Sequence, residues 1–130
     1  MSVGILLVTH PGIGLAIRAV AERTLGRLPL TVELFEVAFD SDPTIALPLA
    51  SSSLRRADTG DGVLILTDAY GASPSNLAHR LGQLGTSVQR VSGLNLPMLL
   101  RTLNYAELPL DELARIAACG GRNGIVADDA

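Results

Sequence analysis

The chain has 130 residues and a net charge of −3, with 48% hydrophobic and only 3% aromatic residues. This length predicts one domain over residues 1–130, with a core large enough to fold without a disulfide or metal staple. The weakly acidic charge, without a basic cluster, argues against nucleic acid as the main partner. All 10 basic residues are Arg, which excludes a P-loop and Schiff-base chemistry because both need Lys.

Two further features concern the compartment. The single cysteine, Cys119, cannot form an internal disulfide or half of a zinc site. The chain opens without a charged and apolar leader, and no apolar stretch approaches the ~20 residues of a membrane span. We therefore expect a soluble, cytoplasmic protein.

The first half of the chain predicts two strands and two helices. A continuous apolar run predicts a buried strand over residues 3–8, and alternation predicts a second strand over residues 31–37. Between them, a helix ending near Gly26 is expected to bury residues at helical spacing, namely Ile13, Ile17, Val20, Ala21 and Leu25. Asp42 and Pro43 predict the start of the next helix, as cap and first-turn residue. Its expected apolar face is Ile45, Leu49 and Leu54, with Pro48 inside the helix.

The second half continues the alternation. Residues 62–67 predict the third and most apolar strand, and residues 86–92 the fourth. A helix opens at Ser73 and Pro74, and helices are expected over residues 96–103 and 111–118. Residues 120–124 predict a flexible turn before the apolar residues 125–127.

Strands that alternate with helices predict an α/β fold: a doubly wound, mainly parallel four-stranded sheet with helices on both faces. In such sheets, ligands bind at the carboxyl ends of the strands, where the strand order reverses. His10 follows the first strand and Asp68 follows the third. If these strands are neighbours, the two side chains lie side by side.

This pair of residues suits reversible phosphoryl transfer. An acid that accepts the Nδ1 proton of His10 fixes the tautomer and leaves Nε2 free to attack phosphorus. The small residues Gly71 and Ala72 would let backbone amides approach the phosphate, and the Ser73 hydroxyl would add a donor. The candidate site therefore consists of His10 and Asp68 as reacting groups and Gly71, Ala72 and Ser73 as phosphate-binding residues, with no metal and no cofactor.

Other interpretations apply to each residue alone. A single His at a strand end is usually structural, Asp68 alone suits a turn, and Ser73 before proline suits a helix cap. A nicotinamide site is rejected because Ile17 stands where the third glycine of the dinucleotide motif should be. A small hydrolase or ligand-binding protein is disfavoured because the chain lacks a Gly-x-Ser-x-Gly motif and a metal-ligand cluster.

Four segments carry a resemblance that extends over nearly the whole chain. They are Thr9-His10, the run Asp68-Ala69-Tyr70-Gly71-Ala72-Ser73-Pro74, the run Val91-Ser92-Gly93-Leu94-Asn95-Leu96-Pro97-Met98-Leu99, and Gly121 to Gly124. With these segments the chain resembles the IIA domain of the mannose-family phosphoenolpyruvate-dependent sugar phosphotransferase system. Two positions depart from the family pattern: Ala72 replaces a glycine, and Pro11 follows the histidine.

The resemblance implies a phosphotransferase component with a phosphohistidine intermediate. His10 would accept phosphate at Nε2 from phospho-HPr and pass it to a IIB component, while Asp68 would bond Nδ1. It also implies a homodimer that exchanges a fifth, antiparallel edge strand, for which residues 125–127 are the candidate here, and an indirect association with the membrane through a permease complex. The alternative is a stand-alone regulatory phosphoacceptor whose phosphorylation state controls partner binding without sugar transport.

Overall fold

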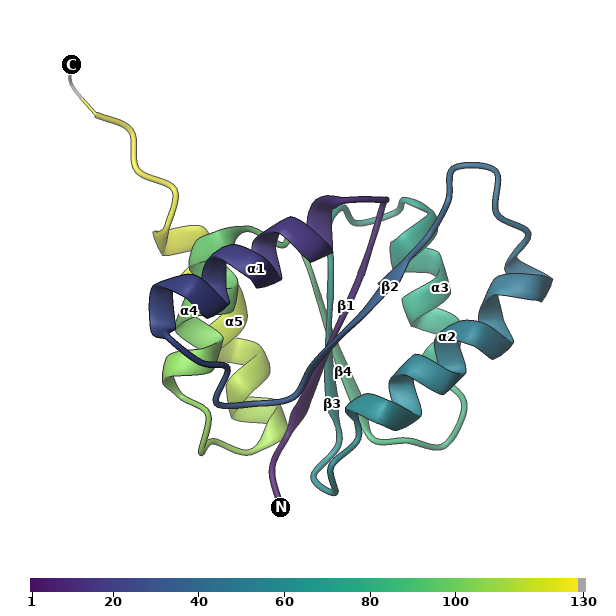
Figure 1. Cartoon of the computed structure of the whole chain (residues 1–130), viewed down its shortest axis with the longest axis horizontal. Helices are drawn as coiled ribbons and strands as arrows, with labels where there is room; N and C mark the ends of the chain where they lie inside the picture. The colour runs from purple at the N-terminus through teal and green to yellow at the C-terminus, as the bar shows by residue number, and fades with distance from the viewer. Residues whose placement is uncertain (129–130) are drawn as a thin grey trace.

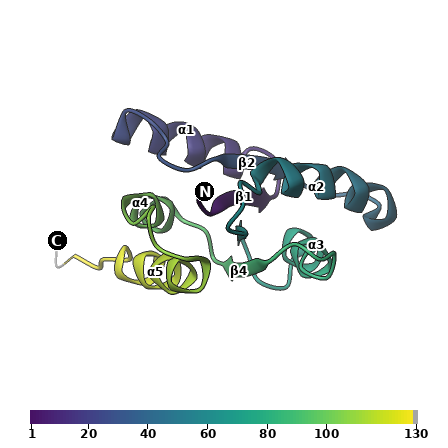
Figure 2. The same cartoon turned by 90° about the horizontal axis from the view of Figure 1, so that it is seen from below.

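The computed structural model describes residues 1–128. Four parallel strands form one sheet in the order β2-β1-β3-β4. The strands are β1 (Gly4–Thr9), β2 (Val32–Glu36), β3 (Val63–Thr67) and β4 (Val88–Ser92). Helices α1 (Ile13–Leu25), α4 (Leu96–Asn104) and α5 (Leu110–Asn123) cover one face of the sheet, and α2 (Pro43–Ala57) and α3 (Ser73–Leu81) cover the other (Figures 1 and 2). The predicted doubly wound α/β fold is confirmed.

The core consists of two clusters separated by the sheet. Successive strand side chains point to opposite faces, so Ile5 and Leu7 pack with α1, α4 and α5, while Leu6 and Val8 pack with α2 and α3. All residues of β1 and β3 are buried. This burial on both faces explains why these two strands are continuous apolar runs rather than alternating ones.

The start of α2 agrees with the sequence prediction. Asp42 is the N-cap, its Oδ1 accepts a hydrogen bond from the Thr44 amide at 2.9 Å, and Pro43 occupies the first turn. Pro48 lies inside the helix. The capping residue and the proline therefore predict the start of α2 without tertiary information.

The predicted buried faces of α1 and α2 are partly wrong. Ile13 and Val20 are exposed, as are Ile45 and Leu49, whereas Leu54 is buried as predicted. In α2 the buried positions beside Leu54 are taken mainly by small residues, namely Ala46, Ala50, Ser53 and Ala57. These small side chains let the helix approach the sheet so closely that a Cβ on Gly4 would lie 1.6 Å from the Ala57 carbonyl oxygen.

The C-terminal prediction also needs correction. Residues 120–123, expected in a turn, continue α5 as far as Asn123. Gly120 and Gly121 are buried, and a Cβ on Gly120 would lie 2.6 Å from the Arg101 Cβ in α4. The Asn95 side chain also donates a hydrogen bond to the Gly121 carbonyl at 3.1 Å. The two glycines therefore serve close packing of α5 on α4, not a turn.

Residues 125–128 follow α5 without regular structure and extend away from the domain (Figure 1). Ile125 and Val126 are exposed. Residues 125–127 form no strand within the chain, and their exchange between subunits stays a prediction.

Candidate functional site

His10 lies at the carboxyl end of β1, at the point where the strand order reverses. Strand β1 lies between β2 and β3, and the chain leaves it through residues 10–12 to enter α1. Gly12 takes a positive φ of 89° before the helix starts. Because β1 and β3 are neighbours, His10 comes directly beside the first residue after β3, Asp68.

Buried and charged partners hold the segment that carries His10. The Thr9 hydroxyl donates a hydrogen bond to the His10 carbonyl at 2.8 Å and accepts one from the Gly14 amide at 3.0 Å. The Glu36 carboxylate accepts a hydrogen bond from the Gly12 amide at 2.5 Å. These bonds tie the segment to the start of α1 and to the end of β2. They restrict how the imidazole can move.

Asp68 fixes the orientation of the His10 ring. Its Oδ2 atom lies 2.7 Å from His10 Nδ1 and also accepts a hydrogen bond from the His10 amide at 2.9 Å. Its Oδ1 atom accepts a hydrogen bond from the Ala69 amide at 3.0 Å. The side chains of His10 and Asp68 are 23% and 8% exposed. An ionised carboxylate only accepts hydrogen bonds, so in the neutral imidazole this contact favours the tautomer with the proton on Nδ1 and the lone pair on Nε2.

The β3–α3 segment brings the other predicted residues after Asp68. Gly71 has a φ of 86°, and the Ala72 amide donates to the Ala69 carbonyl at 3.3 Å, which closes a turn over residues 69–72. Ser73 is exposed at the start of α3. Within the described chain no side chain caps this helix, whereas Asp42 caps α2 and Asn95 caps α4. The N-terminus of α3 therefore offers uncapped amides to an anion.

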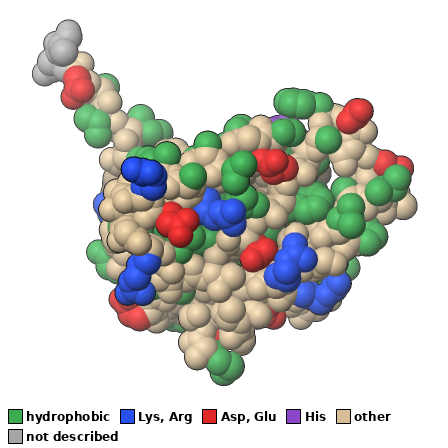
Figure 3. Space-filling model, viewed as in Figure 1, with side chains coloured by type: hydrophobic (Ala, Val, Ile, Leu, Met, Phe, Trp, Pro, Cys, Tyr) green, Lys and Arg blue, Asp and Glu red, His purple; other side chains and the backbone are tan. Residues whose placement is uncertain are grey.

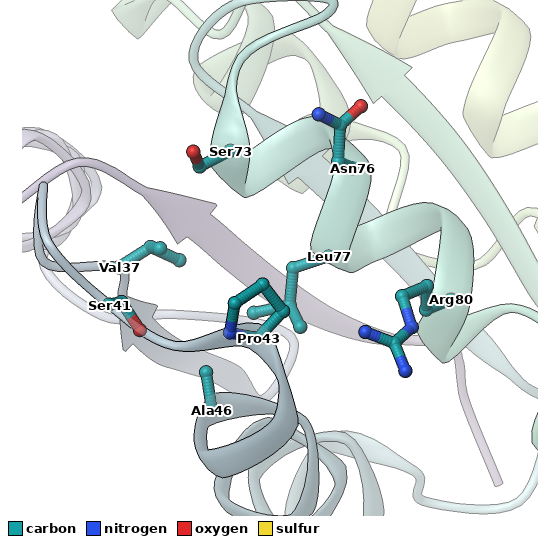
Figure 4. A pocket seen from close by; sticks show the side chains of 8 residues that line it. All are labelled: Val37, Ser41, Pro43, Ala46, Ser73, Asn76, Leu77 and Arg80. Carbon is teal, nitrogen blue, oxygen red and sulfur yellow. The ribbon is translucent and has the colours of Figure 1, made fainter.

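A cavity of about 160 Å³ adjoins the first turns of α2 and α3 (Figure 4). Ser73, Asn76 and Arg80 line it from α3, and Val37 and Ser41 line it from the segment before α2. The segment between β2 and α2 is thus placed beside the start of α3.

Phe39, in this segment, makes a contact that sequence reasoning missed. Its ring stacks on the His10 imidazole with the ring centroids 5.0 Å apart and the planes inclined by 25°. Local sequence gives no signal for this contact, because Phe39 and His10 meet only through the pairing of β1 with β2. Glu36, which binds the Gly12 amide, was missed for the same reason.

Three features bear on other classes of site. Among residues 1–128, no three His, Cys, Asp or Glu side chains are grouped as metal ligands. None of the helices in this range combines the length and apolar composition needed to cross a bilayer. On the face seen in Figure 3, acidic and basic side chains are interspersed with apolar ones rather than gathered by sign.

Comparison with known proteins relates this chain to one family. The EIIA-man family model, described as the PTS system fructose IIA component, matches residues 4–117. The chain is 30% identical over 129 residues to the PTS system mannose-specific EIIAB component of Escherichia coli (strain K12), and it is equally similar to that component of Shigella flexneri. The match covers 98% of this chain but 40% of these relatives.

Solved structures agree on the fold. The mannose/sorbose-specific IIA subunit of the phosphotransferase system from Enterococcus faecalis superimposes with a TM-score of 0.87 at 21% identity, covering 100% of this chain and 97% of that one. The IIA protein associated with the fucose utilization operon of Streptococcus pneumoniae gives 0.78 at 22% identity, covering 98% and 96%.

Proposed function

The chain belongs to the EIIA-man family of phosphotransferase-system IIA components, and from this premise we propose that it is a phosphocarrier whose phosphoacceptor is His10. The Nε2 atom would accept a phosphoryl group from the phosphohistidine of HPr and pass it to a IIB component. The protein would work in the cytoplasm, as a homodimer, and would reach the membrane only through a permease complex.

The hydrogen bond between His10 Nδ1 and Asp68 Oδ2 is the observation that supports this proposal most directly. With the proton held on Nδ1, the Nε2 lone pair forms a bond to phosphorus while the bond from phosphorus to the donor nitrogen breaks. The electron pair of that bond stays with the donor, and the His10 ring gains the positive charge. Onward transfer runs the same step in reverse, with the acceptor nucleophile taking the phosphoryl group.

The start of α3 would hold the phosphate. Its uncapped amides and the Ser73 hydroxyl can donate hydrogen bonds to the phosphate oxygens, and the positive end of the helix dipole favours their charge. Gly71 and Ala72 keep this turn small, and Gly71 adopts a φ that other residues rarely take. We assign Gly71, Ala72 and Ser73 to phosphate binding on this basis.

The surroundings of His10 suit a protein partner rather than an enclosed small molecule. Phe39 and Tyr70 are 84% and 88% exposed, and they lie on the β2–α2 and β3–α3 segments that border the site. Exposed aromatic side chains of this kind are favoured at protein interfaces. They would contact HPr and a IIB component in turn.

A labelling experiment tests the proposal. Phosphoenolpyruvate, enzyme I and HPr should add one acid-labile phosphate per chain to the wild type and none to His10→Ala. His79→Ala is the matched control because His79 is the second of the two histidines and is exposed, and it should label fully. Label that persists in His10→Ala would refute the assignment.

The same experiment separates transport from regulation. Adding a IIB component should discharge the labelled protein within the mixing time of a manual assay if it is a phosphocarrier. A phosphate that persists in the presence of several IIB components would instead favour the stand-alone regulatory phosphoacceptor.

A further inference from the structure

We propose that Phe39 is a positioning residue for His10 whose aromatic face stabilises the phosphorylated, positively charged imidazole ring. The inference rests on the proposed function, because it takes His10 as the phosphoacceptor. It adds a residue outside the His10–Asp68 pair and the α3 turn, and it assigns that residue a physical effect on the stability of phosphohistidine.

The contact between the two rings is close and nearly parallel. The ring centroids lie 5.0 Å apart with an interplanar angle of 25°. Asp68 contacts the Nδ1 edge of the imidazole, while the Phe39 ring is stacked on one face. A stacked ring leaves the in-plane direction at Nε2 open, which is where phosphorus must approach. Phe39 can therefore act on the ring without blocking the reaction.

The turn that carries Phe39 is anchored at both ends. The Val37 amide donates a hydrogen bond to the Thr9 carbonyl at 2.8 Å, and Val37 is buried. The Ser41 amide donates to the Ala38 carbonyl at 3.1 Å, and Asp42 then caps α2. Since Val37 bonds the residue immediately before His10, strand pairing itself sets the position of the turn relative to the imidazole.

Phe39 contributes little to the core. Its side chain is 84% exposed and belongs to neither core cluster. A side chain with this exposure can be truncated with little effect on the free energy of unfolding. Its effect on His10 can thus be measured in a folded protein.

The stacked Phe39 ring can affect phosphorylation because the charge of the His10 ring changes in the reaction. Phosphorylation at Nε2 with Nδ1–H retained makes the ring a cation, and hydrolysis removes that charge. In hydrolysis, a water oxygen bonds to phosphorus as the Nε2–P bond breaks, and the electron pair of that bond returns to the ring. The face of an aromatic ring carries partial negative charge and attracts a cation. At exposed sites this attraction changes an equilibrium or rate constant by about two- to fivefold. Phe39 should therefore favour phosphohistidine over the free imidazole.

The test follows the decay of the phosphate by ³¹P NMR after the donor is removed. Wild type, Phe39→Tyr, Phe39→Leu and Phe39→Ala are loaded both with phospho-HPr and with phosphoramidate, a chemical donor that needs no partner protein. We expect Phe39→Leu and Phe39→Ala to lose phosphate roughly two- to fivefold faster than wild type. Phe39→Tyr, which keeps an aromatic face, should restore the wild-type rate. In the unphosphorylated protein, the His10 ring protons should lose their ring-current shift in Phe39→Leu but keep it in Phe39→Tyr.

The controls separate this effect from simpler ones. Leu49→Ala truncates another exposed apolar side chain, in the groove beside β2, and should decay like wild type. Equal decay rates in wild type and all Phe39 variants would overturn the proposal. A Phe39→Leu variant that decays like wild type would also overturn it, since Leu keeps an apolar side chain beside His10 but not the aromatic face. A wild-type protein that is phosphorylated by phosphoramidate but not by phospho-HPr would refute HPr as the donor, and the decay rates of the phosphoramidate-loaded proteins would still test the role of Phe39. No loading of His10 by either donor would refute both.

Discussion

The Asp68 side chain takes part in three hydrogen bonds, and their arrangement favours one tautomer of the His10 ring. One oxygen accepts from both the ring and the backbone of His10, and the other accepts from the Ala69 amide. All three partners are donors in this arrangement. The side chain at this position must therefore accept hydrogen bonds at both of its terminal atoms, as the two oxygens of a carboxylate do.

This requirement predicts the effect of Asp68→Asn. If the Asn oxygen faces His10, its NH₂ group meets the Ala69 N–H; if it is flipped, its NH₂ group meets the His10 amide and forces the ring proton onto Nε2. Loss of a hydrogen bond to a charged group costs about 1.5–3 kcal/mol. We expect the initial rate of phosphorylation by phospho-HPr to fall roughly ten- to a hundredfold by the same argument.

Quench-flow with acid-labile phosphate as the readout measures this rate. Asp61→Asn, at an exposed position before β3, is the matched control and should react like wild type. A wild-type rate in Asp68→Asn would show that the carboxylate does not orient the proposed phosphoacceptor, His10.

At the scale of elements, small residues determine how closely the helices approach. The Ala-rich face of α2 packs against β1, and Gly120 and Gly121 let α5 pack against α4. Large apolar side chains such as Ile45 and Leu49 then lie outside. Hydrophobicity alone therefore misidentified part of the buried faces, because close packing here selects small volume over apolar area.

The contact between β1 and α2 predicts a strong effect of Gly4→Ala. A Cβ would overlap the Ala57 carbonyl oxygen, which is backbone and cannot rotate away. The helix must shift, and overpacking of this kind typically costs 1–3 kcal/mol. Urea denaturation should show the free energy of unfolding lowered by about 2 kcal/mol or more.

Gly82→Ala serves as the matched control for this variant. Gly82 has a φ of −64°, and an added Cβ would lie 3.5 Å from its nearest neighbour. Its stability should equal or exceed that of wild type, because Ala reduces the entropy of the unfolded chain. If Gly4→Ala were as stable as Gly82→Ala, the close approach of α2 to β1 would be wrong.

Asn95 joins two helices and predicts a second stability effect. Its Oδ1 atom accepts from the Met98 amide at 2.9 Å as the cap of α4, and its Nδ2 atom donates to the Gly121 carbonyl at 3.1 Å. Asn95→Ala should lower the free energy of unfolding by about 1–3 kcal/mol, through a lost cap and an unpaired carbonyl. Asn104→Ala, at the exposed end of α4, should change it by less than about 0.5 kcal/mol. Thermal denaturation of the pair provides the comparison.

For the whole molecule, strand order is what brings the site together. His10 and Asp68 are 58 residues apart in sequence but are in contact because β1 and β3 are adjacent, at the point where the strand order reverses. The β2–α2 segment reaches the same edge from the other side of β1 and delivers Phe39. Each contribution comes from a different strand end, as expected for a ligand site in a doubly wound sheet.

The proposed homodimer gives a prediction at this scale. If residues 125–127 form an edge strand on a second subunit, removing residues 125–130 should convert the dimer to monomer in analytical ultracentrifugation. Phosphorylation of His10 by phosphoramidate should persist, because the site lies within one chain. A chain of residues 1–130 that sediments as a monomer at micromolar concentration would refute the exchange.

Local chemistry in the sequence determined much of this protein: the alternation of strands and helices, the cap at Asp42, and the candidate pair His10 and Asp68. These features depend on residues close in the chain or on a general rule of parallel sheets, so the sequence alone predicts them. Tertiary structure alone decided the small-residue faces of α2 and α5, the continuation of α5 through Gly120 and Gly121, and the Phe39 stack on His10. The reason is that interhelical distance and contacts between segments depend on how the strands pair and how volumes fit across the whole core, and no local pattern contains that information.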